Sequence, residues 1–209
     1  MGLSRSFHWV FLVWLFAASS ACVAGPPPTC SEPACFVVAE PAAWPAGGSQ
    51  SGLTVMFRRF TLQVPSSPET VASQPGLLAM VYPLGRVVLS EDHRDSIHPG
   101  LARAGMSTDE WAEIVFTNTP EDPAPGNPQA NRLWNELLQT KVVWPTGAEV
   151  TRYQREGLTA YLVSGGAPHD HDVLIVDKEQ PDQLFRMSVD GFDRRLVEAL
   201  LGSLRQNQR

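Results

Sequence analysis

The chain has 209 residues, of which 43% are hydrophobic, so it is long enough to build one domain with a real core. Its formal net charge is −6 at pH 7. An acidic chain is a poor ligand for nucleic acid or for anionic lipid headgroups, so we expect no nucleic-acid partner. A basic protein partner would suit this charge, although a similar acidic excess is common among proteins of many functions.

An export signal is predicted over residues 1–21. Arg5 is the only charged side chain before Cys22, an apolar run follows at Trp9–Ala18, and small residues follow at Ser19–Ala21. This order of basic, apolar and small residues is typical of a secretory signal peptide. The alternative is a membrane anchor, but a spanning helix needs about 20 apolar residues and this run is shorter. We therefore expect cleavage and a periplasmic location.

The residues before Cys22 resemble a bacterial lipobox, in which a diacylglyceryl group is attached to the cysteine. Ser19 departs from the usual Leu, Val or Ile, and ordinary cleavage after Ala21 or Ala24 is the competing prediction. In such lipoproteins, an Asp directly after the cysteine retains the protein in the inner membrane. The residue at this position here is Val23. A lipid on Cys22 is therefore expected to anchor the protein at the outer membrane, facing the periplasm.

Residues 22–52 are predicted to form a linker, because a Pro-Pro-Pro run and a Gly-Gly pair leave little apolar surface to bury. Within it, Cys30 and Cys35 are expected to form a disulfide in an oxidising compartment. Two thiols without nearby histidines would make a poor zinc site. The stretch Cys35–Val38 is a candidate for one additional strand.

A single domain is predicted over residues 53–209. Alternating apolar residues predict a strand at Phe60–Val64, which Pro65 ends. A turn between two apolar runs predicts a hairpin from Leu77–Tyr82 and Arg86–Ser90. The charged segment Glu91–Gly100 is expected to be a loop.

Two helices are predicted next. Ser107 and Glu110 have the spacing of a capping box. The second helix is expected to begin after Asn127, with Pro128 at its first position. Its buried stripe is expected to consist of Leu133, Trp134, Leu137 and Leu138.

Four strands and a helix are predicted for the remainder. Glu149–Arg155 and Leu158–Ser164 flank a Glu-Gly turn, and a second pair is expected at Asp172–Asp177 and Gln183–Asp190. A helix ending near Arg205 is expected to bury Phe192, Leu196, Leu200 and Leu204. Hairpin-linked strands with helices on the sheet faces predict an α+β fold with a mainly antiparallel sheet.

From about Phe60 to Arg205 this arrangement resembles the PsbP-like fold, an α/β/α sandwich shared by bacterial DcrB-like envelope lipoproteins. The similar features are the strand ending in proline, the helices around Trp111 and Trp134, and the final strand that leads into Phe192 and the last helix. The resemblance implies proteins that bind other proteins or assist membrane complexes. It carries over no functional residue, because the fold has no common active site.

The densest polar cluster is His169-Asp170-His171-Asp172. Alternate residues of a strand share a face, so His169 and His171 with a carboxylate from elsewhere would suit zinc. The favoured interpretation is a hydrophilic loop, because Gly165–Pro168 precedes the cluster and has the composition of a turn.

Other candidates for chemistry are weaker. Glu91, Asp92 and Asp95 lie in the predicted charged loop, which suggests a solvated surface rather than an enclosed acid–base pair. The sequence contains no nucleophile elbow and no phosphate-binding glycine loop, so we expect no catalytic residue, no metal and no cofactor. Trp144 would be a good interface anchor if exposed, and packing against the sheet is the alternative.

The sequence therefore predicts a non-enzymatic, periplasm-facing lipoprotein that binds a protein partner. The loops around Glu91–Asp95 and His169–Asp172, with Trp144, are the expected partner surface. The sharpest version is an immunity protein that neutralises a toxic effector delivered by a neighbouring cell, as type VI secretion delivers them. The alternatives are an envelope-assembly or stress adaptor, and a metal-binding protein or hydrolase that uses His169 and His171.

Overall fold

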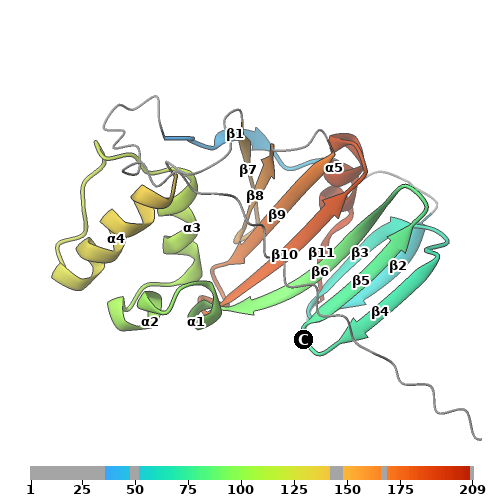
Figure 1. The fold of residues 1–209 in the computed structure, drawn as a ribbon, viewed down its shortest axis with the longest axis horizontal. Helices are drawn as coiled ribbons and strands as arrows, with labels where there is room; N and C mark the ends of the chain where they lie inside the picture. Colours follow the sequence, from blue (N-terminus) through green and yellow to red (C-terminus); the bar gives the residue numbers. More distant parts are fainter. Residues whose placement is uncertain (1–35, 48–51, 142–147, 166–168, 208–209) are drawn as a thin grey trace, which may run out of the picture.

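The computed structural model describes residues 36–47, 52–141, 148–165 and 169–207. These residues form an eight-stranded sheet, a three-stranded sheet and helices packed around them (Figure 1). All neighbouring strands of both sheets are antiparallel except β1 and β7, which pair in parallel. The fold is therefore α+β with a mainly antiparallel sheet, as the sequence predicted.

The elements have the following bounds. In spatial order, the eight-stranded sheet consists of β1 (Glu40–Ala43), β7 (Glu149–Arg155), β8 (Leu158–Ser164), β9 (Asp170–Asp177), β10 (Gln183–Asp190), β6 (Gly85–His93), β5 (Leu77–Tyr82) and β4 (Thr70–Gln74). The three-stranded sheet consists of β11 (Arg205–Gln206), β3 (Phe60–Pro65) and β2 (Gly52–Phe57). The helices are α1 (Arg94–Ile97), α2 (Gly100–Ala104), α3 (Thr108–Phe116), α4 (Pro128–Lys141) and α5 (Arg194–Ser203).

The eight-stranded sheet separates two hydrophobic cores. Along β8, Ala160 and Leu162 pack toward the three-stranded sheet and α5, whereas Tyr161 packs toward α3 and α4. This alternation follows from the two-residue period of a strand, which sends successive side chains to opposite faces. The domain therefore has three layers: a helical layer, the large sheet, and a layer made of the small sheet and α5.

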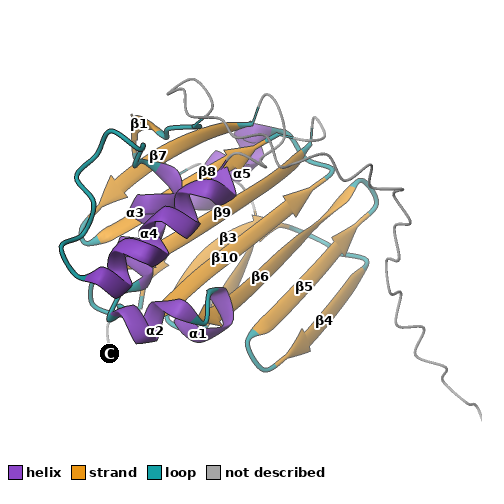
Figure 2. Ribbon diagram, turned by 60° about the vertical axis from the view of Figure 1, so that its left-hand side comes forward, coloured by secondary structure: helices purple, strands orange, loops and turns teal. Residues whose placement is uncertain are grey.

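The helical layer covers only part of its face of the large sheet. Figure 2 shows α3 and α4 over the β7–β9 side, while no described helix lies over β4 and β5. On the opposite face, Met80 of β5 and Val87 and Leu89 of β6 are each at most 1% exposed. The β5–β6 part of the sheet is thus buried on one face and open on the other.

The predicted caps are confirmed. The Ser107 side chain accepts a hydrogen bond from the Glu110 backbone N–H, and the Glu110 carboxylate accepts one from the Ser107 backbone N–H at 2.7 Å. Asn127 accepts a hydrogen bond from the Gln129 N–H at 2.9 Å, so it caps α4. The buried Thr108 docks the start of α3 on the large sheet, because its hydroxyl donates to the Gln183 carbonyl at 3.0 Å.

The predicted linker differs from the structure at its C-terminal end. Phe36 and Ala39 are buried in the helical core, and the Ala39 N–H donates to the Phe116 carbonyl at 2.7 Å. Trp44 packs against the other core, with the Arg155 guanidinium 4.6 Å from its ring centre. Apolar residues between the prolines therefore fold residues 36–47 onto the domain, where they supply the edge strand β1.

Gly202 of α5 allows this N-terminal segment to approach the helix. A Cβ atom at Gly202 would lie 2.5 Å from the Ala46 carbonyl oxygen, closer than real contacts allow. The glycine in the last turn of α5 is therefore required by the close approach of the N-terminal segment, and not by an unusual backbone conformation.

Two predicted boundaries also differ. The segment Glu91–Gly100 is not a loop, because β6 continues to His93 in register with Gln183 and α1 follows directly. The last helix ends at Ser203 rather than near Arg205, because Arg205 and Gln206 pair with β3 as β11. In both places pairing with a distant strand determines the local structure.

Some predicted features lie outside the described residues. These are the signal peptide over residues 1–21, the lipidation site Cys22, the disulfide Cys30–Cys35, and Trp144. Among the helices that the structure describes, none has the length and apolar character needed to cross a membrane.

Candidate binding face

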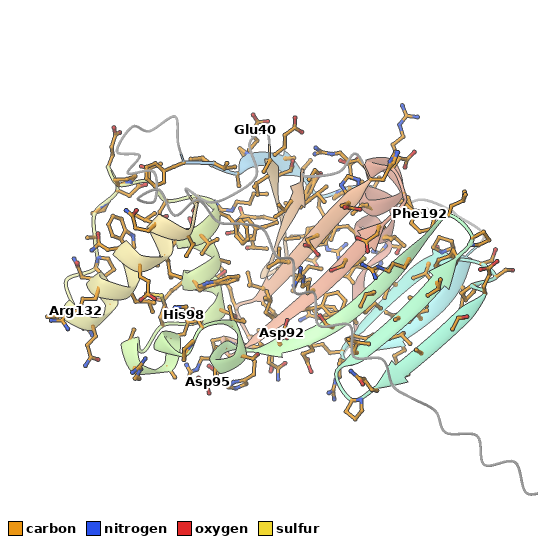
Figure 3. The ribbon with its side chains drawn as sticks, in the orientation of Figure 1. Glu40, Asp92, Asp95, His98, Arg132 and Phe192 are labelled. Atoms are coloured by element: carbon orange, nitrogen blue, oxygen red, sulfur yellow. The ribbon has the colours of Figure 1, made fainter. Side chains whose placement is uncertain are left out.

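The three predicted acidic residues near β6 do not share one surface. Glu91 points to the side of the three-stranded sheet, where its carboxylate lies 3.1 Å from Arg58 Nε. Asp92 is the next residue on the strand and points to the helical side. Asp95 lies on α1 and is exposed, and Figure 3 shows it near Asp92 at the end of β6. Strand alternation therefore separates Glu91 from the other two.

The cluster His169–Asp172 is divided in the same way. His169 lies in the turn before β9, Asp170 and Asp172 point to the helical side, and His171 points to the opposite side and is 6% exposed. The predicted hydrophilic loop is therefore in part a strand. Within the residues that the structure describes, no group of three or more His, Cys, Asp or Glu side chains could hold a metal ion.

The uncovered part of the large sheet brings Asp170 and Asp172 together with residues from four other strands. Directly opposed residues in antiparallel strands share a face, so the register defines three rows across the sheet. We call these rows the open face. They are Thr70–Val81–Arg86–Asp190–Asp170, Ala72–Ala79–Val88–Ser188–Asp172 and Gln74–Leu77–Ser90–Arg186.

The charged side chains of the open face are partly paired. Arg186 donates to both oxygens of Asp172, from Nη2 at 2.8 Å and from Nε at 3.2 Å, and Arg86 forms an ion pair with Asp190. The hydrogen bonds from Arg186 to Asp172 raise the pKa of Arg186, so this guanidinium stays charged. With Asp92 at its rim, the open face carries two arginines and four aspartates and is net acidic.

The structure also reveals a serine–histidine contact that the sequence analysis missed. Ser164 and His171 are directly opposed on β8 and β9, and Ser164 Oγ lies 2.9 Å from His171 Nδ1. No pattern in the sequence indicates this pair, because the register between β8 and β9 creates it. The contact links the end of β8 to the start of β9, and neither residue belongs to the open face.

The pKa of His171 is lowered, first by burial and then by the nearby charges of Arg194 and His169. The folded protein therefore binds fewer protons than the unfolded chain just below the ordinary histidine pKa of about 6.5. The free energy of unfolding should consequently fall as the pH drops below about 6.5. In urea unfolding from about pH 5 to 7, His171→Gln should give a shallower pH dependence than the unsubstituted protein. Equal slopes would contradict this assignment.

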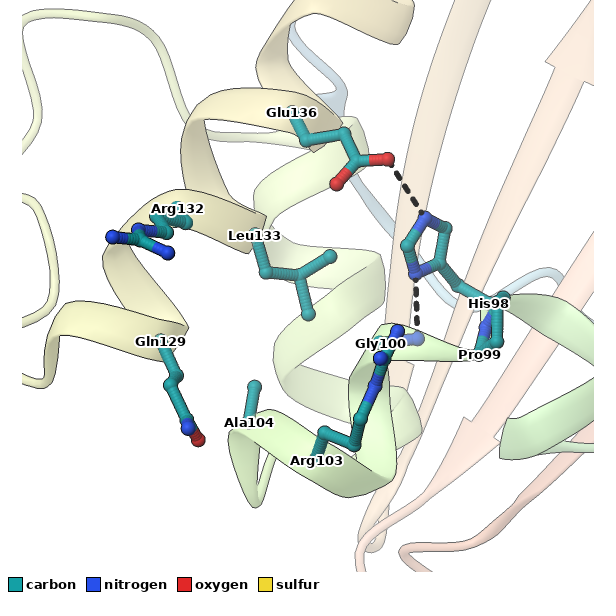
Figure 4. Close-up of a pocket in the computed structure, with 9 residues that line it drawn as sticks. All are labelled: His98, Pro99, Gly100, Arg103, Ala104, Gln129, Arg132, Leu133 and Glu136. Carbon is teal, nitrogen blue, oxygen red and sulfur yellow. Dashed lines mark hydrogen bonds and ion pairs between the residues drawn. The ribbon is translucent and has the colours of Figure 1, made fainter.

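A second concave surface lies between α2 and α4 (Figure 4). This cleft of about 420 Å³ has Leu133 at its floor, and His98 Nε2 lies 3.4 Å from a Glu136 oxygen at one end. Because His98 Nδ1 accepts a hydrogen bond from the Gly100 N–H, the ring proton sits on Nε2 and faces Glu136. Arg103 and Arg132 also line the cleft, and none of the predicted partner-binding residues that the structure describes does.

No known family model matches the chain. No curated protein sequence is significantly similar to it either.

Proposed function

We propose that this domain binds a protein partner across the open face and performs no catalysis. The observation that supports this proposal is the contrast between the two faces of β5 and β6 in the large sheet. One face is sealed by the three-stranded sheet and α5, while the other presents Val81 at 41% exposure together with half-buried Val88 and Leu77. Contiguous apolar side chains rimmed by charges are typical of protein interfaces.

The chemistry of the open face favours a basic partner. Its arginines are held by Asp172 and Asp190, whereas Asp92 and Asp170 have carboxylates that a partner's cations can approach. Complementary charge speeds association and suppresses wrong partners. This agrees with the acidic balance of the whole chain, whose net charge is −6.

We further propose that the protein is an outer-membrane lipoprotein tethered through Cys22 and facing the periplasm. The layer order supports a PsbP-like fold, since helices cover one face of a central antiparallel sheet and α5 packs on the other. Among possible partners, we infer a toxic effector that the protein neutralises as an immunity protein. An envelope-assembly or stress adaptor would use the same surface with a different partner.

The first test is capture of partners by the tagged full-length protein extracted from the membranes of its host. Immunity predicts one stoichiometric toxin-like protein, encoded beside this gene, whose toxicity the protein suppresses when both are expressed. Recovery of envelope-assembly machinery would support the adaptor role instead. Capture of a protein with neither property supports neither version.

The open face is tested by charge reversal of its two unpaired aspartates. The double variant Asp92→Lys with Asp170→Lys should weaken partner binding by about tenfold or more, because it replaces attraction by repulsion. The double variant Glu121→Lys with Glu179→Lys changes the net charge equally at exposed sites off the open face, and should bind normally. Equal binding by both double variants would contradict the proposed surface.

A further inference from the structure

Among the residues that the structure describes, β4 is an unprotected edge of the eight-stranded sheet. All five of its residues, Thr70–Gln74, are exposed, and no described strand pairs with its outer side. Natural edge strands usually carry charges, prolines or bulges that prevent pairing with another chain. The opposite edge strand, β1, contains Glu40 and Pro41, whereas β4 contains neither a charge nor a proline.

The outward hydrogen-bonding groups of β4 follow from its hairpin with β5. Gln74 and Leu77 are opposed across a two-residue turn, so they form a hydrogen-bonded pair. Such pairs alternate along an antiparallel ladder, so Thr70 and Ala72 also direct their N–H and C=O groups toward β5. The same groups of Val71 and Ser73 therefore point away from the sheet and are available to a further strand.

We propose that a second copy of this chain pairs with β4, antiparallel and with its two-fold axis at Ala72. In this register Val71 and Ser73 form hydrogen-bonded pairs with Ser73 and Val71 of the other copy, and Ala72 faces its own counterpart. Thr70 faces Gln74, so no charged residue opposes another within the paired segment. An isologous contact of this kind requires a self-complementary strand, and β4 meets that requirement.

A half-exposed apolar side chain at this edge supports a second copy as the occupant rather than water. Val71 of β4 is 56% exposed on the side that packs toward the three-stranded sheet. Across the proposed two-fold axis, the Val71 side chains of the two copies would be diagonal neighbours about 7–8 Å apart, within reach of each other. Pairing would also join the two open faces into one continuous surface.

Cysteine cross-linking in membranes of cells that express the full chain tests this register. In the proposed dimer, Ala72→Cys places two thiols in a non-hydrogen-bonded pair with Cα atoms about 4.5 Å apart, within disulfide range. Thr70→Cys lies on the same face of β4, but its counterpart is about 13 Å away. Mild oxidation should therefore link most Ala72→Cys chains into dimers on a non-reducing gel.

The natural cysteines require a background measurement, which the unsubstituted chain provides. Thr70→Cys should show no more dimer than this background. Equal linking by the two variants would overturn the register, and linking of Ala72→Cys to a different protein would overturn the second copy as the occupant.

Sedimentation of the purified full chain in detergent supplies an independent measurement. The unsubstituted protein should sediment as a dimer. Ala72→Lys should make it monomeric, because two ammonium groups would then oppose each other. Met56→Lys, at a side chain 73% exposed on β2, should leave the dimer intact. A monomeric unsubstituted protein would overturn the proposal.

Discussion

Replacement of Asp177 by alanine is expected to lower the free energy of unfolding by about 3–5 kcal/mol, because it leaves a partly buried arginine without its partner. Asp177 is 2% exposed at the end of β9, and its carboxylate lies 2.6 Å from Arg59 Nη1. The same carboxylate accepts hydrogen bonds from the Glu179 N–H at 2.8 Å and from the Gln206 side-chain amide. This one side chain thus connects the large sheet, the β2–β3 turn and β11.

Urea unfolding measures this effect, and Asp182→Ala is the matched control. Asp182 also forms an ion pair with an arginine, since its Oδ1 lies 2.8 Å from Arg94 Nη1, but the Asp182 side chain is 45% exposed. An exposed ion pair of this kind contributes about 1 kcal/mol or less. Similar losses for the two variants would show that Asp177 does not hold the layers together.

Replacement of Tyr161 by alanine should cost about 3–5 kcal/mol, because it opens a cavity in the helical core. The Tyr161 ring is fully buried and stacks on Phe116, with ring centres 4.6 Å apart. Phe116 is the last residue of α3, and its carbonyl accepts the Ala39 N–H. The stack therefore fixes α3, and with it the border between the covered and open parts of the sheet.

Tyr161→Phe separates the contribution of the ring from that of the hydroxyl. The hydroxyl lies 3.5 Å from the Glu113 carboxylate, a long hydrogen bond, and burial raises the pKa of Tyr161 so that it stays protonated. We expect Tyr161→Phe to cost about 1 kcal/mol or less in urea unfolding. A loss as large as that of Tyr161→Ala would mean that the hydroxyl, and not the packing, matters.

Local patterns predicted the long elements well. The capping box at Ser107 and the Glu156-Gly157 hairpin depend on residues close in sequence, and both are confirmed. The two turn residues have positive φ angles of 44° and 83°, which suit this turn. The strands β2, β4 and β11 were not predicted, and the additional strand expected at Cys35–Val38 is β1 at Glu40–Ala43, because distant partners and not their own periodicity determine these strands.

The candidate site was only partly predictable for the same reason. Sequence analysis selected Asp92, Asp170 and Asp172, and the structure places them on the helical face of the large sheet. It grouped Glu91 and His171 with them, although strand alternation turns both side chains to the other face. Arg186 and Ser188 were missed, because only the register between β9 and β10 brings them to Asp172. The part of the face that β4 and β5 contribute has no charged residue, so no charged cluster in the sequence indicated it.

The most direct test of the proposed function is protection of the open face by the bound partner. Val81→Cys on the open face and Met56→Cys on β2 place one additional exposed thiol each on opposite sides of the domain. Maleimide labelling at each position is measured by peptide mass spectrometry, with and without the captured partner. We expect the partner to protect position 81 and to leave position 56 fully reactive. Equal labelling of position 81 in the free and bound protein would contradict binding at the open face.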